Sequence, residues 1–129
     1  MLLIVDEIQA GLGRSGKLWA FEHSEIEPDM IATSKALGGG LPISAVIAKS
    51  DILTEWGPGA HVSTQAGNVL ACAAGNYVLD VVSSEEFLKK VNEVGSYFLD
   101  GLKDLEKRHQ IIGHIDNKGI YTAIPSPKS

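Results

Sequence analysis

Short apolar runs, each followed by a charged residue, dominate the first fifty positions of the chain. Residues 2–5 are continuously apolar and end at Asp6, and residues 30–33 form a second run that Lys35 follows closely. Runs of this length without polar alternation are typical of strands covered on both faces of a parallel sheet. Residues 42–48 are rich in β-branched side chains and predict a third strand. Residues 21–26 and 51–56 predict short helical segments.

Helical periodicity takes over in the second half. Between residues 68 and 82, apolar side chains recur at three- and four-residue steps, which predicts a core-facing helix. A capping-box pattern at residues 83–86 precedes a longer amphipathic helix from Phe87 to Leu105. A further strand is expected to begin at residues 111–113, a weaker one lies at 121–124, and residues 125–129 should be disordered. These elements predict an α/β fold.

Length and charge narrow the functional classes. The 129 residues allow one domain at most, and the formal charge of −5 is spread among interspersed acidic and basic residues. Neither a nucleic-acid partner nor a membrane is expected, and no apolar run reaches the length of a transmembrane span. The single cysteine, Cys72, is interpreted as a small buried helix residue, in keeping with a reducing, cytoplasmic location. Four histidines lack metal-ligand spacing, so no metal site is expected.

Asp6 and Lys35 are the main candidates for chemistry. Ligands of open α/β sheets bind outside the carboxyl ends of the strands, so two opposite charges that follow two strands predict one shared site. An amine placed there could form a Schiff base, which suggests a carbonyl cofactor. Taken singly, a lysine at Lys35 is far more often a surface residue at a strand end, and Asp6 could be a turn-capping or ion-paired carboxylate.

Two further motifs have alternative interpretations. Residues 11–16 match the GxGxxG pattern of dinucleotide-binding loops. However, they stand five residues beyond the strand and no clear amphipathic helix follows, so a loop-shaping role is favoured. Residues 61–68 place hydroxyl groups and a glycine before a helix. Such a helix start could hold phosphate, or its polar residues could simply cap the helix.

The order and spacing of these motifs resemble one enzyme family. The run Asp6-Glu7-Ile8-Gln9, the glycine loop, Lys35 with its triple glycine, and Thr64 with its helix follow one another, and 35 − 6 and 64 − 35 are both 29. This pattern resembles the class III aminotransferases, the pyridoxal 5'-phosphate (PLP) family that includes ornithine, 4-aminobutyrate and acetylornithine aminotransferases. The resemblance implies that residues 1–113 are part of the large, cofactor-binding domain of a fold-type I PLP enzyme, with a mainly parallel sheet and flanking helices. Residues 114–129 would form a divergent C-terminal tail.

The resemblance also implies residue roles. Asp6 would pair with the pyridine nitrogen of PLP, Gln9 would hydrogen-bond the phenolic oxygen, and Ile8 would pack on one ring face. Lys35 would form the internal aldimine and then carry the proton during catalysis. Thr64 would bind the phosphate group in the site of a neighbouring subunit, which makes a homodimer part of the expectation.

The implied reaction is transfer of an amino group from an amino acid or amine, through the cofactor, to a 2-oxo acid. Three alternatives stay open. An aminomutase or decarboxylase would use the same aspartate and lysine. A non-catalytic interaction fragment is possible because the chain covers less than half of a family member and is expected to lack full activity alone. Nucleotide binding rests only on the glycine loop.

Overall fold

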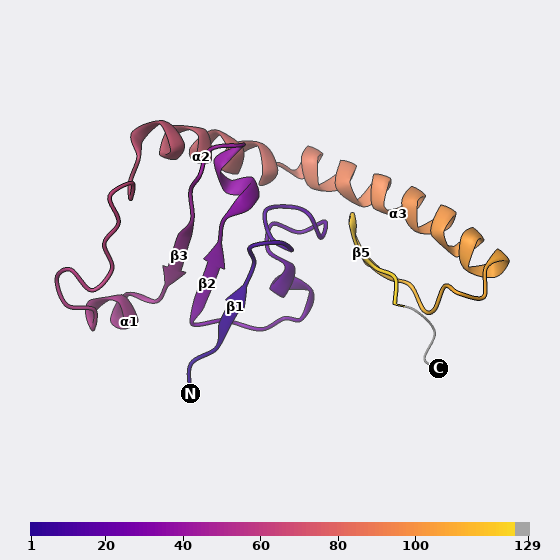
Figure 1. Ribbon diagram of the computed structural model, residues 1–129, viewed down its shortest axis with the longest axis horizontal. Helices are drawn as coiled ribbons and strands as arrows, with labels where there is room; N and C mark the ends of the chain where they lie inside the picture. The colour runs from indigo at the N-terminus through magenta and orange to yellow at the C-terminus, as the bar shows by residue number, and fades with distance from the viewer. Residues whose placement is uncertain (126–129) are drawn as a thin grey trace.

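The computed structural model describes residues 1–125 and combines a three-stranded sheet, two long helices and a C-terminal hairpin (Figure 1). The strands are β1 (Ile4–Asp6), β2 (Met30–Thr33), β3 (Ala45–Ala48), β4 (Asp116–Lys118) and β5 (Tyr121–Ala123). The α-helices are α1 (Ser50–Thr54), α2 (Val69–Val82) and α3 (Glu85–Arg108), and two 3-10 turns are η1 (Ala20–His23) and η2 (Lys35–Gly38). The predicted α/β class is therefore confirmed.

The sheet is mixed, with the order β1-β2-β3. β1 pairs with β2 in parallel, so that Asp6 lies opposite Ala32, and β2 pairs with β3 in antiparallel orientation. A parallel third strand would need a long crossover, but only η2 and a short glycine-rich link connect β2 to β3. The sheet is consequently less parallel than the family resemblance implied.

The strand at residues 2–5 was expected to be covered on both faces, and this expectation is wrong for the described chain. Leu2 is 56% exposed and Ile4 is 62% exposed. In Figure 1, α2 lies across one end of the strands and no helix covers the face of the sheet. Within residues 1–125, Ile4 and the preceding Leu2 are therefore largely uncovered, while Val5 is half-buried.

The core lies at the junction of the glycine loop, η2 and the corner between the two long helices. Leu12, Leu37 and Val82 form its buried centre, and Val78 and Phe87 pack against them. The glycine loop thus contributes a buried leucine to the core, which agrees with the loop-shaping interpretation.

The helix at residues 69–82 forms as predicted, but its buried face is narrower than expected. Asn68 caps it by accepting hydrogen bonds from the backbone N–H groups of Leu70 and Ala71, both at 3.1 Å. Val69 and Tyr77, expected in the core, are 79% and 71% exposed. The helix contacts η2 along one edge, where Gly75 lies against the Leu37 carbonyl and Val78 packs on the core. Cys72 is half-buried rather than buried.

The second helix begins at Glu85, two residues before the expected start at Phe87. Ser84 is the N-cap, because its Oγ accepts a hydrogen bond from the backbone N–H of Phe87 at 3.3 Å. The third helical position is then Phe87, so no glutamate returns the hydrogen bond. The helix continues to Arg108, beyond the expected end at Leu105.

The C-terminal hairpin packs against the glycine loop and α3. Residues 111–113 form no strand, β5 confirms the strand expected at 121–124, and β4 was not predicted. The backbone N–H of Ile120 donates to the Arg14 carbonyl at 3.0 Å. Within the tail expected to be disordered, the Pro125 carbonyl accepts a hydrogen bond from Gly113 at 3.0 Å, and residues 126–129 lie outside the described residues. The division after residue 113 stays a prediction.

Candidate active site

A concavity of about 410 Å³ opens beside the carboxyl ends of β1 and β2. Its lining consists of Asp6, Ile8, Gln9, Ala10, Lys35 and Tyr121. Four of the five residues singled out in the sequence therefore line one surface depression. The lining contains one amine, one carboxyl group, one amide and one phenol, together with small apolar surfaces.

The end of β1 determines which side chains face this concavity. Asp6 ends β1, and Ile8 and Gln9 stand in the turn beyond it. All three line the concavity, whereas Glu7 does not. The Glu7 N–H extends the ladder by donating to the Ala32 carbonyl at 2.9 Å. The Ile8 N–H then donates to Asp6 Oδ1 at 3.0 Å, which holds the aspartate side chain against the turn.

Lys35 begins η2, immediately beyond β2, and is exposed to solvent. Its φ of 46° lies in the left-handed region, a conformation that costs a non-glycine residue on the order of 1 to 2 kcal/mol. The adjacent residue is fastened, because Ser34 Oγ donates to the Ile43 carbonyl at 2.9 Å. The following turn rests on α2 at Gly75, where an added Cβ would meet the Leu37 carbonyl at 3.3 Å. Tertiary contacts on both sides therefore maintain the strained backbone of Lys35.

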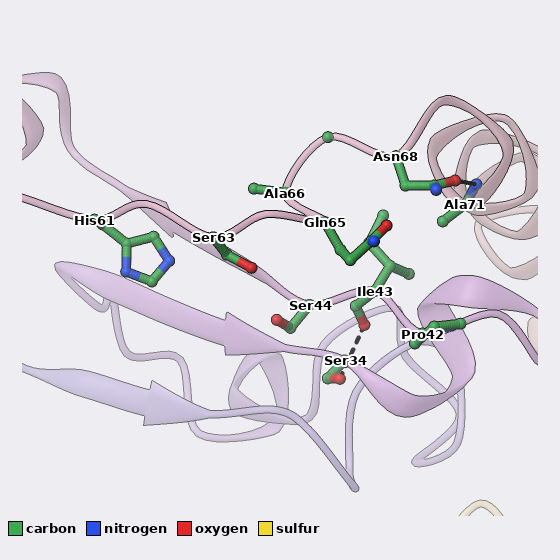
Figure 2. A pocket seen from close by; sticks show the side chains of 11 residues that line it. Ser34, Pro42, Ile43, Ser44, His61, Ser63, Gln65, Ala66, Asn68 and Ala71 are labelled. Carbon is green, nitrogen blue, oxygen red and sulfur yellow. Dashed lines mark hydrogen bonds between the residues drawn. The ribbon is translucent and has the colours of Figure 1, made fainter. Parts of the chain in front are cut away.

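Thr64 does not join the other four residues. It is exposed in the connection before α2 and does not line the concavity of Asp6 and Lys35. Its neighbours Ser63 and Gln65 line a second depression of about 370 Å³, shown in Figure 2, which Ser34 and Asn68 also line. Lys35 follows Ser34 directly, so the two depressions lie on neighbouring residues of one turn.

The clear pKa shifts occur at the opposite end of the sheet. The pKa of Asp29 is lowered, first by a hydrogen bond from the Leu3 N–H and then by Lys49. The pKa of Lys49 is raised by its hydrogen bonds to Asp29, at 3.1 Å, and to Glu27, at 3.3 Å. Asp29 precedes β2 and Lys49 follows β3, so this cluster fastens the strand ends away from the candidate site.

Sequence reasoning missed two residues of this region. Tyr121 lines the concavity although it stands in the segment interpreted as a divergent tail. No local pattern could have placed it there, because its position depends on the docking of the hairpin to the glycine loop. The sequence gives Glu7 no role beyond its place in a motif, yet it is 3% exposed and accepts two backbone hydrogen bonds. A charged residue next to a candidate-site carboxyl group was the available signal.

Comparison with known proteins shows the family. The model of the aminotransferase class III family matches residues 1–129. Acetylornithine aminotransferase of Caldanaerobacter subterraneus subsp. tengcongensis is 47% identical over 120 residues, which cover 93% of this chain and 30% of that enzyme. A leucine/methionine racemase of Thermococcus litoralis is 39% identical over 124 residues, covering 96% of this chain and 28% of the racemase.

A solved structure agrees with these matches. Ornithine aminotransferase of Toxoplasma gondii superposes with a TM-score of 0.89 and 39% identity, over 98% of this chain and 30% of the enzyme, and that structure has partial occupancy of PLP at its active site. The chain therefore belongs to the class III aminotransferase family. It spans about 30% of the length of the curated relatives it matches.

The described part of the chain adds two negative observations. Within residues 1–125, no helix combines the length and apolarity needed to cross a bilayer. The same residues contain no group of three or more histidine, cysteine, aspartate or glutamate side chains placed to hold a metal ion.

Proposed function

We propose that this chain is the part of a PLP-dependent aminotransferase that supplies the lysine and the aspartate of the cofactor site. The observation that carries the proposal is the shared concavity of Asp6, Gln9 and Lys35, at the ends of two parallel strands. Membership of the family and the PLP found in a solved relative support it.

The chemistry of the lining residues fits PLP. The Lys35 amine suits the aldehyde of the cofactor, the Asp6 carboxyl group suits the ring nitrogen, and the Gln9 amide suits the phenolic oxygen. Ile8 offers an apolar contact to the ring. The described lining of this concavity includes no cation besides Lys35, so the phosphate group would need residues from elsewhere, and Thr64 of a second subunit is our candidate.

When bound, PLP supplies an aldehyde that condenses with amines and a ring that withdraws electrons from the reacting carbon. Lys35 would anchor the aldehyde end and, once released by the incoming amine, would carry a proton to and from the substrate carbon through Nζ. Asp6 would hold a proton on the ring nitrogen. The complete protein would then exchange an amino group between an amino acid or amine and a 2-oxo acid, as a cytoplasmic homodimer.

Reductive trapping tests the proposal. The chain is incubated with PLP, reduced with borohydride, digested and analysed by mass spectrometry. We expect the modification on Lys35, its loss in Lys35→Ala, and full retention in the control Lys49→Ala, because Lys49 is engaged by Asp29 at the far end of the sheet. Modification spread equally over surface lysines, and unchanged in Lys35→Ala, would contradict the proposed site.

A racemase is the second candidate function, since a racemase is 39% identical to this chain. Both reactions start by removing a proton from the carbon next to the amine, for which Lys35 and Asp6 would serve equally well. Incubation of the complete protein with one enantiomer of an amino acid separates them. Without an acceptor, a transaminase makes at most one equivalent of 2-oxo acid per site, because its cofactor keeps the amino group. A racemase makes the mirror-image amino acid in many turnovers without an acceptor.

A further inference from the structure

Glu7 directly follows β1 and is a buried acidic residue outside the lining of the candidate site. It is 3% exposed, although glutamate is almost never fully buried unless its polar atoms find partners. Its Oε2 accepts a hydrogen bond from the Ala20 N–H at 3.0 Å, and its Oε1 accepts one from the Phe21 N–H at 2.9 Å. Both acceptor atoms are therefore used, on the first turn of η1.

The backbone of Glu7 is fixed as well. Its N–H donates to the Ala32 carbonyl of β2 at 2.9 Å, and its carbonyl accepts from the Gly11 N–H at 3.1 Å. An added Cβ on Gly11 would lie 2.8 Å from the Glu7 carbonyl and 2.9 Å from Oε2. Four hydrogen bonds and a close glycine contact therefore hold this single residue in place.

Asp6 and Ile8 flank Glu7 in the chain and line the concavity, whereas Glu7 itself does not. A rotation of the chain about Glu7 would turn both side chains away from Lys35, which follows a different strand, β2. We infer that Glu7 is a positioning residue, which fixes the direction of Asp6 and Ile8 and thereby sets the affinity of the site for its cofactor. This inference rests on the proposed function, because PLP is the ligand on which the positioning acts.

The chain offers a matched control. Glu22 also caps the start of η1, where its Oε1 accepts a hydrogen bond from the Trp19 N–H at 2.7 Å, but it has no link to β1. Loss of Glu22 loosens the same turn without releasing Asp6. A glutamine in place of Glu7 keeps the shape but offers only one acceptor, so one of the two backbone N–H groups would face an amide donor.

The experiment is a double-mutant cycle on the chain with PLP itself, read as a Kd from equilibrium dialysis. We expect Glu7→Gln to weaken binding about tenfold, the effect of losing one hydrogen bond to a charged group. Glu22→Gln should change the Kd less than about twofold at an equal loss of melting temperature. In the Asp6→Asn background, Glu7→Gln should add less than about twofold, because residues that act through one another are not additive.

A second perturbation covers the case in which Glu7→Gln fails to fold. Gly11→Ala presses on Glu7 without changing any charge, and it should weaken PLP binding in the same direction. Equal Kd changes for the Glu7 and Glu22 variants, or full additivity with Asp6→Asn, would overturn the positioning role while trapping at Lys35 persists. Absence of trapping in the unmodified chain would instead refute the proposed function, and the positioning role with it.

Discussion

Two glycines of α3 give opposite predictions for the same substitution. Gly95 is buried where the hairpin packs, and an added Cβ would collide with the backbone of Gly119, including its carbonyl oxygen. Gly101, six residues further along, has no atom within 4 Å of an added Cβ. Gly95→Ala and Gly101→Ala make the same change inside the same helix, and they differ only in whether the added methyl group meets a neighbouring segment.

The magnitudes follow from two opposing effects. Alanine in a helix interior is favoured over glycine by about 1 kcal/mol, and both variants gain this amount. Overpacking costs up to about 3 kcal/mol when the neighbour cannot move. Gly119 cannot withdraw, because its φ of 56° is left-handed and its own Cβ position lies 2.6 Å from the Arg14 carbonyl. We therefore expect Gly95→Ala to lose about 2 kcal/mol of unfolding free energy, and Gly101→Ala to gain up to about 1 kcal/mol.

Urea unfolding followed by far-UV circular dichroism measures both changes. The midpoints should move in opposite directions, by about 1 M for the destabilised variant at the m-values usual for small domains. Amide hydrogen exchange provides an independent readout, since the Ile120 N–H donates to Arg14 and should lose protection only in Gly95→Ala. If both variants raise the midpoint equally, the hairpin does not pack on α3 as described.

Two further predictions concern side chains that hold the ends of a helix or of strands. Asn68→Ala should cost about 1 kcal/mol, because two N–H groups at the start of α2 lose their acceptor, and a urea midpoint equal to that of the unmodified chain would contradict this. Asp29→Asn should destabilise the chain at neutral pH, because the folded state lowers the pKa of Asp29 and so favours its ionised form. This stabilisation is fully present above the pKa of the unfolded state, and it is lost as the pH falls through the pKa of the folded state. The midpoint difference between Asp29→Asn and the parent chain should therefore vanish in acid, and a difference that persists there would refute the role of the Leu3 and Lys49 contacts.

Local patterns were sufficient for much of the site. Asp6 and Lys35 each follow a strand, and the parallel pairing of β1 with β2 brings both to one edge, as the position of ligands in α/β sheets predicts. Ile8 stands in the turn that follows β1 and lines the same concavity. The helix starts were also predictable, because Asn68 and Ser84 are residues with strong capping tendencies.

Features that depend on contacts distant in sequence were not predictable. The helical period places Val69 and Tyr77 on the apolar face of α2. Which part of that face is buried depends on where η2 and the loops pack. Burial of the strands would require partners that residues 1–125 do not provide. Tyr121 reaches the concavity only because the hairpin docks on the glycine loop, a contact between segments more than 100 residues apart. Thr64 stays apart from the site within one chain.

The proposed site requires the Lys35 amine and the Asp6 carboxyl group to face one another across a single cofactor. A crystal structure of the borohydride-reduced PLP adduct tests it most directly. We predict a covalent bond between Lys35 Nζ and the cofactor, with the ring nitrogen against the Asp6 carboxyl group and Ile8 on one ring face. A ring attached to Lys35 that points away from β1, with Asp6 directed to solvent, would contradict the account.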